Sequence, residues 1–188
     1  MVKEMPKILG GIMGLFNKNK SKNKYVELYE EYYLDSLNRL NGLTIAVNPE
    51  WELLPFLAVI CDFACTRARK DNREIMGSIM EHVRKKYIKN QEEMDVFLDR
   101  IELYMKTVNG GKLRAEWLFG KVEGINRNAV IDSCIVLGDI LANPSCADDY
   151  EKAPLLIHGI SDVFPFSNLF NSHFYPMMVE FHNKIYRA

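Results

Sequence analysis

Two cysteines are the most direct candidates for reactive chemistry in this chain. Cys61 and Cys65 are four residues apart, so an α-helix places both thiols on one face, where they could share a metal ion or a redox role. Arg67 and Arg69 follow closely, and positive charge lowers the pKa of a thiol. The immediate neighbours of the two cysteines are mostly apolar, however, and free cysteines are commonly buried. The pattern therefore favours two small core residues over a reactive pair.

Zinc-ligand residue types also occur, but without the spacing of a zinc site. The candidates are His158, His173, His182 and Cys146. Structural zinc sites pair their ligands at short intervals such as C-x-x-C or H-x-x-x-H, and no such pair connects these residues. On one continuous helix His173 and His182 would face opposite ways. The sequence therefore predicts no metal site and no cofactor, and each histidine is interpreted as a surface or core residue.

Carboxylates on predicted helices offer a second route to metal or acid–base chemistry. Glu27, Glu31 and Asp35 recur at helical spacing, but the Glu-x-x-His motif of di-iron bundles occurs nowhere in the sequence, so a solvated face is favoured. Asp132 and Asp139 lie seven residues apart on the most apolar predicted helix. Buried carboxylates are rarely left unpaired. The favoured interpretation of this aspartate pair is structural pairing, and the alternative is that the two side chains line a ligand pocket.

Motifs for binding nucleotides or nucleic acids are incomplete. Gly110-Gly111-Lys112 lacks the upstream glycine of a P-loop. The segment 119–130 resembles a helix-turn-helix only superficially, because its second helix is too apolar to lie in a major groove. Basic residues cluster at 67–73 and 84–89, which would lie about 20 Å apart at opposite ends of one helix. The sequence therefore disfavours nucleic-acid binding, and no nucleophile-elbow motif indicates a catalytic serine or cysteine.

The elements that would position these residues are helices. Periodicity near 3.6 residues dominates from Tyr25 onward and alternating strand patterns are nearly absent, which predicts an all-α fold. Helices are expected at about 24–41, 48–70, 90–109, 113–119 and 126–142, with another beginning after Asp71. Asn48, Asp71 and Asn90 are the predicted N-caps, the last with Glu93 in a capping box. Pro55 should kink or restart its helix, and Gly110-Gly111 should end the helix that begins at Asn90.

The C-terminal third is expected to form an irregular, aromatic-rich layer. Pro154, Pro165 and Pro176 divide the last 35 residues into short helical pieces, and this segment holds seven aromatic residues. Added to the preceding segments, these pieces predict a single-domain bundle of six to eight helices over residues 25–188. A near-continuous apolar helix at 126–142 is expected at its centre.

Composition and charge agree with one folded domain. The 188 residues are 48% hydrophobic and 26% charged, as in ordinary globular proteins. Residues 1–24 carry six lysines against one glutamate, a local charge of +5, so the remaining 164 residues sum to −6. The four cysteines lack the spacing of a disulfide scaffold, which indicates a reducing cytoplasm. The longest apolar run beyond the N-terminal region has nine residues, whereas a membrane-spanning helix needs about 20, so no transmembrane segment is expected.

The first 24 residues, the N-terminal arm, are expected to be an amphipathic segment and a lysine-rich connector. Helical spacing places five apolar residues, the apolar stripe, on one side: Ile8, Leu9, Ile12, Leu15 and Phe16. The connector supplies Lys18, Lys20, Lys22 and Lys24. An apolar segment followed by lysines fits peripheral membrane attachment, and the favoured alternative is docking on the protein's own domain or on a sister subunit. We expect the arm to bind one of these surfaces and to be dispensable for folding.

No feature assigns an activity, so the functional interpretation rests on elimination. The favoured function is a non-enzymatic cytoplasmic interaction protein, of regulator, adaptor or toxin-neutralising type, that contacts another protein or associates with itself. The first alternative is a small-molecule-binding protein or enzyme with a pocket near Asp132 and Asp139. The second is a peripheral membrane protein attached through residues 6–24.

Overall fold

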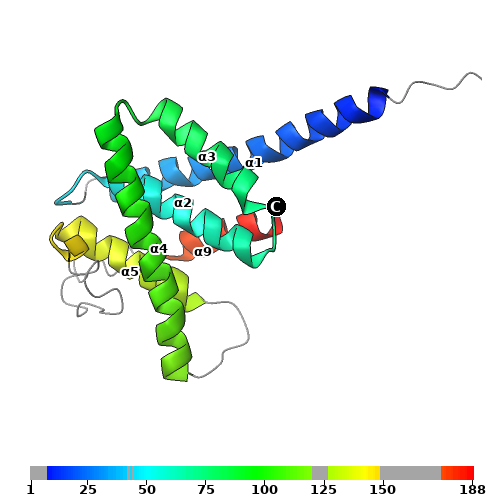
Figure 1. Ribbon diagram of the computed structural model, residues 1–188. Coiled ribbons are helices and arrows are strands. Elements are labelled where there is room, and N and C mark those ends of the chain that lie inside the picture. The colour runs from blue at the N-terminus through cyan, green and yellow to red at the C-terminus, as the bar shows by residue number, and fades with distance from the viewer. Residues whose placement is uncertain (1–7, 42, 44, 120–126, 149–174) are drawn as a thin grey trace, which may run out of the picture.

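The fold is all-α, as predicted. The computed structural model describes residues 8–41, 43, 45–119, 127–148 and 175–188, and within these ranges there are helices and no strands. Six helices are described over their full length: α1 (Ile8–Leu40), α2 (Pro49–Arg67), α3 (Asn72–Lys86), α4 (Gln91–Phe119), α5 (Arg127–Ala142) and α9 (Tyr175–Arg187). A further helical turn begins at 146–148. Figure 1 shows these helices crossing one another in a bundle, with the N-terminal turns of α1 extending beyond it.

Helix α2 is the centre of the bundle. Every residue from Glu52 to Cys61 is buried, so the helix presents apolar side chains in all directions. A helix that is apolar all round must be covered on all sides. Helices α1, α3, α4, α5 and α9 each pack against it, and α5 also packs against α4 and α9. The sequence placed α5 at the centre of the core, whereas the structure gives that position to α2.

The predicted N-caps differ in how they are made. The side chain of Asn48 accepts a hydrogen bond from the backbone N–H of Glu50 at 3.0 Å and caps α2. The Asn90 side chain accepts from the N–H of Glu93 at 2.9 Å, and the Glu93 carboxylate accepts from the N–H of Lys89, which confirms a reciprocal cap. Asp71 occupies the N-cap position of α3 but makes no side-chain cap bond.

Two helices run further than the sequence predicted. Helix α1 begins at Ile8, so the lysine-rich connector is helical and the expected start near Lys24 is wrong. Lysine, asparagine and serine lower helix stability only modestly, and no glycine or proline interrupts residues 17–40. Helix α4 continues through Gly110-Gly111 to Phe119, so these glycines do not end it and 113–119 is not a separate helix. Glycine costs a helix about 1 kcal/mol without blocking it sterically, and α5 packs along α4.

Proline has a smaller effect on α2 than the sequence suggested. Pro55 is buried inside α2 and does not restart the helix, which runs unbroken to Arg67. At the C-terminus, Pro176 is the second residue of α9, where its missing N–H costs no helical hydrogen bond. The expected irregular layer falls largely on 149–174, outside the described residues.

The contrast between two caps gives a stability prediction. We expect Asn48→Ala to lower the free energy of unfolding by about 1 kcal/mol, because it leaves the Glu50 N–H without its acceptor. Asp71→Ala should cost only a few tenths of a kcal/mol, because Asp71 contributes a charge near a helix N-terminus and no cap bond. Urea unfolding of both variants would measure the difference. Equal losses would contradict the assigned caps.

Candidate functional site

The residues singled out for chemistry mostly lie in the core. Cys61 and Cys65 are both buried, as interpreted from the sequence. A hydrogen bond to Cys65, together with burial, raises the pKa of the Cys61 thiol, while the same bond lowers the pKa of Cys65. The described residues contain no cluster of three or more histidine, cysteine or acidic side chains arranged to hold a metal ion. Chemistry at the cysteine pair would require the core to open.

The histidine and aspartate candidates are only partly described. His182 is 3% exposed and its ring stacks on Tyr186, and burial lowers its pKa. His158 and His173 lie outside the described residues. Asp139 is fully buried on α5, whereas the side chain of Asp132 lies outside the described ones. A pocket beside this aspartate pair therefore stays a prediction.

The most distinctive surface is an apolar groove that the sequence analysis did not identify. It has a volume of about 210 Å³ and lies where α3 and α4 both rest on α2. Its floor comes from Ala58, Val59 and Asp62 of α2, and its walls from Met76 and Met80 of α3 and Leu98, Ile101 and Met105 of α4. Seven of these eight residues are apolar. We call this feature the α2–α3–α4 groove.

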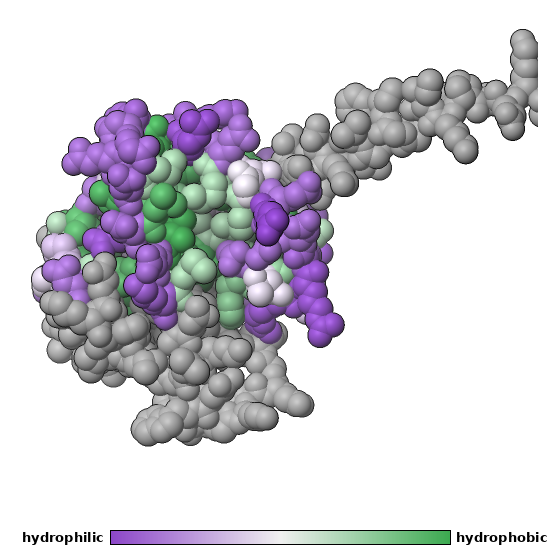
Figure 2. All heavy atoms as spheres, viewed as in Figure 1, coloured by the Kyte–Doolittle hydropathy of each residue, from purple (hydrophilic) through white to green (hydrophobic). Residues whose placement is uncertain are grey.

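Parts of the groove are open to solvent. Leu98 is 44% exposed and Met105 is 42% exposed, although both are large apolar side chains. Figure 2 shows hydrophobic residues gathered where α2, α3 and α4 meet, with hydrophilic residues at the border. Contiguous exposed apolar surface with a polar rim is typical of an interaction site. Methionine side chains adapt to differently shaped partners because they are flexible and polarizable.

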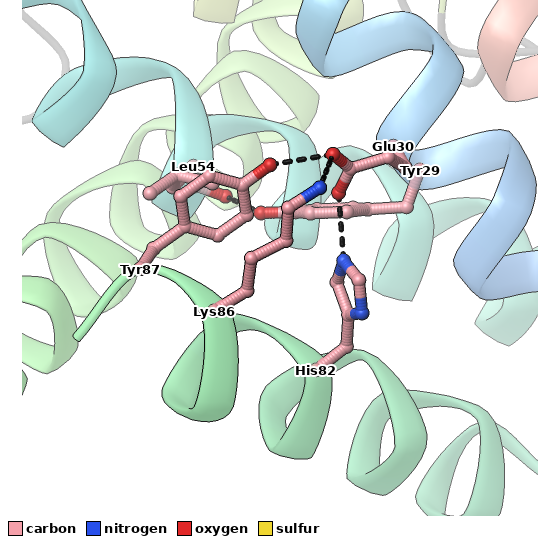
Figure 3. Close-up of polar contacts among 6 residues, drawn as sticks. All are labelled: Tyr29, Glu30, Leu54, His82, Lys86 and Tyr87. Atoms are coloured by element: carbon pink, nitrogen blue, oxygen red, sulfur yellow. Dashed lines mark hydrogen bonds and ion pairs between the residues drawn. The ribbon is translucent and has the colours of Figure 1, made fainter.

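Helix α3 is fixed by a polar cluster centred on a carboxylate of α1, the Glu30 clamp, which comprises Glu30, His82, Lys86 and Tyr87. Figure 3 shows the three α3-side groups converging on Glu30. His82 Nε2 lies 2.6 Å from Glu30 Oε2, Tyr87 donates to Oε1 at 2.6 Å, and Lys86 pairs with Oε1. Burial favours the neutral form of Glu30, but the hydrogen bonds from Lys86, Tyr87 and His82 outweigh it and hold its pKa below the usual value. The clamp holds α3 at a set distance from α1.

Helix α4 is fixed to the floor helix by a second polar cluster. Glu52 of α2 accepts hydrogen bonds from Arg100 at 3.0 Å and from the hydroxyl of Tyr104 at 2.8 Å. The Glu52 side chain is 5% exposed, and burial raises its pKa against the opposing effect of Arg100 and Tyr104. One polar cluster therefore locates α3 relative to α1, and the other locates α4 relative to α2.

The missed groove has a recognisable signal in the sequence. Helical spacing places the apolar residues of α3 and α4 in neighbouring columns, and among the described side chains these columns differ in exposure. Ile79 of α3 and Phe97 of α4 are fully buried, whereas Met80 is half-buried and Leu98 is exposed. Each helix thus has two neighbouring columns of apolar residues, and its contact with α2 can bury only one of them. The second column on both helices forms the groove walls.

Comparison with known proteins adds no assignment. No family model, curated protein or solved structure matches the chain. Among the helices that are described, none combines the length and apolarity that a bilayer-spanning segment requires.

The Glu30 clamp gives a prediction with a defined pH dependence. A carboxyl whose pKa is lowered by folding stabilises the fold above its unfolded pKa, and this contribution disappears as the pH falls through the folded pKa. We expect Glu30→Gln to lower the free energy of unfolding by about 1–3 kcal/mol at pH 7, because charged hydrogen bonds are lost from a mostly buried site. The difference from wild type should close as the pH is lowered below 4.

The matched control for this prediction is Glu27→Gln, which removes the same charge one turn earlier at an exposed position of α1. Urea unfolding at several pH values would measure both variants. A Glu30→Gln deficit of the same size at pH 7 and at low pH would show that the charge of Glu30 does not stabilise the contact.

Proposed function

We propose that the protein is a non-enzymatic interaction protein that binds an amphipathic helix of another protein in the α2–α3–α4 groove. The observation that carries this proposal is an apolar groove with exposed leucine and methionine side chains between two fixed helices. Amphipathic helices are commonly recognised by laying their apolar face into such a groove, with anchor residues at i, i+3 or i+4, and i+7.

The dimensions of the groove fit a short helical face. Leu98 and Met105 are seven residues apart, so the α4 wall is about 10 Å long, which corresponds to two turns of a helix. An apolar cavity of about 150 Å³ holds a benzene-sized group. The 210 Å³ of the groove therefore suits one or two large anchor side chains, with the rest of the helix outside.

Charged residues around the groove favour one orientation of a bound helix. On α4, the exposed acidic residues Asp95 and Glu102 lie one turn to either side of Leu98. On α3, the exposed residues Arg73 and Arg84 lie one turn before Met76 and one turn after Met80. Walls of opposite charge favour one orientation of a charged helix and disfavour its reverse. The groove thus carries features that select among partners.

The two alternatives remain as proposals of lower rank. A ligand pocket near Asp132 and Asp139 is supported by a fully buried carboxylate on α5, and it would make the protein a small-molecule binder or enzyme. Membrane attachment through residues 6–24 is supported by the lysine-rich N-terminal turns of α1, which extend beyond the bundle (Figure 1). A cytoplasmic location is supported by four buried cysteines that form no disulfide.

Site-specific photo-crosslinking tests the groove as an interaction site. A benzophenone amino acid at Leu98 should trap a partner protein in the native cell, because this side chain is exposed at the groove. The same amino acid at Leu34, an equally exposed position on α1, is the matched control. We expect mass spectrometry to identify one or a few proteins specific to position 98. Identical products at both positions, or none at either, would remove the support for this function.

A further inference from the structure

We infer that the groove of one copy of this chain binds the N-terminal arm of a second copy, and that two copies exchange arms to form a dimer. This inference rests on the proposed groove function and names its occupant. Four independent features lead to it: the geometry of α1, the composition of the arm, the charge of the groove walls and the symmetry of exchange.

The geometry of α1 prevents the arm from reaching its own groove. Helix α1 is continuous from Ile8 to Leu40, and no glycine or proline lies between Leu15 and Leu40 to bend it. Among the residues of α1 whose burial the structure describes, which begin at Lys24, Tyr25 is the first that is buried, and it lies about 20 Å along the helix from Ile12. Figure 1 shows the N-terminal turns pointing away from α2, α3 and α4. The course of the α1 backbone therefore directs the arm away from the groove of its own copy.

The composition of the arm requires a partner. Gly10, Gly11 and Gly14 each cost the helix about 1 kcal/mol relative to alanine. A helical segment with this deficit persists when its apolar face is buried, since tertiary packing supplies most helix stability. The apolar stripe has the i, i+4, i+7 spacing, through Ile8, Ile12 and Leu15, that grooves of this kind accept.

The charge of the groove walls orients the arm. The lysines at 18–24 follow the apolar stripe directly. The α4 wall offers exposed Asp95 and Asp99, while Glu102 pairs with Lys106 at 2.8 Å, and the α3 wall ends in Arg73 and Arg84. Lysines of a docked arm are attracted to the α4 wall and repelled from the α3 wall. The arm therefore lies along α4, with its apolar stripe over the methionines of α3 and the exposed side chains of α4.

When each copy places its arm in the groove of the other, the assembly is complete with two copies. Each copy has one arm and one groove, so a two-fold dimer satisfies both arms and both grooves and leaves no free end. A partner helix that uses the same groove must displace an arm. Self-association would then compete with partner binding, and the dimer would be the resting form of the groove.

Sedimentation velocity of the full-length protein at micromolar concentration tests the inference with two double variants. The arm variant is Ile12→Glu with Leu15→Glu, which keeps good helix formers in the helix. The groove variant is Leu98→Lys with Met105→Lys, at exposed positions. The control is Val96→Lys with Leu34→Lys, which adds the same charge at equally exposed positions outside the groove.

Wild type and control should dimerise equally, and each test variant should dimerise about 30-fold more weakly or worse, as expected for loss of a central anchor. An equimolar mixture of the two test variants should regain a complex, because one supplies an intact groove and the other an intact arm. Such a complex cannot arise from misfolded variants. A monomeric wild type, dimers insensitive to either variant, or a mixture without complex would overturn the inference.

A membrane is the competing surface for the arm. If the arm is docked in the groove, the dimer should show no salt-sensitive cosedimentation with vesicles of phosphatidylcholine and phosphatidylserine. The arm would be assigned to membranes if wild type is monomeric and binds vesicles, if the arm variant does not bind them, and if the groove variant still does. If self-association fails while position 98 still crosslinks another protein, only the arm inference fails. If position 98 also traps nothing specific, the groove function fails as well.

Discussion

The burial of α2 on all sides is the constraint on which the rest of the structure depends. Ten consecutive residues from Glu52 to Cys61 are removed from water, which no pair of helices can achieve. Five other helices are arranged around α2 because each covers a different part of its circumference. The groove arises from the same constraint, since α3 and α4 cover neighbouring parts of α2, and apolar side chains of both helices that are not fully buried line the space between them.

Polar contacts then determine where the covering helices sit. Apolar packing is non-directional, so a helix resting on α2 by apolar contact alone could slide or rotate at little cost. The Glu30 clamp joins α1 to α3 with three groups on one carboxylate, and Glu52 joins α2 to α4 through Arg100 and Tyr104. The hydroxyl of Tyr29 adds a bond of 2.7 Å to the carbonyl of Leu54 between α1 and α2. Breaking these contacts would leave a buried carboxylate without its partners, which makes the arrangement specific.

The sequence predicted the fold class and several helix boundaries, because those depend on local chemistry. The caps at Asn48 and Asn90 follow from side chains within a few residues of the helix ends. Continuation of α4 past Gly110-Gly111 could not be predicted, because packing against a distant helix offsets the cost of glycine. Glu30 could not be distinguished from Glu27 and Glu31, because its partners come from residues 52 to 57 positions away. The groove could not be predicted either, because the sequence does not show which apolar residues of α3 and α4 remain exposed after these helices pack on α2.

Helix α2 is covered on all sides and α3 is not, so the two helices should also differ in local stability. Backbone amides of α2 are shielded from every direction, so they exchange hydrogen only when the whole bundle opens. Helix α3 is covered on one side and held to α1 by the Glu30 clamp, and Gly77 on its outer face meets open space. Opening of α3 therefore requires the loss of a few polar contacts and one apolar face. The backbone amides of α3 should therefore exchange hydrogen at a lower free-energy cost than those of α2, by local opening that leaves the rest of the bundle folded.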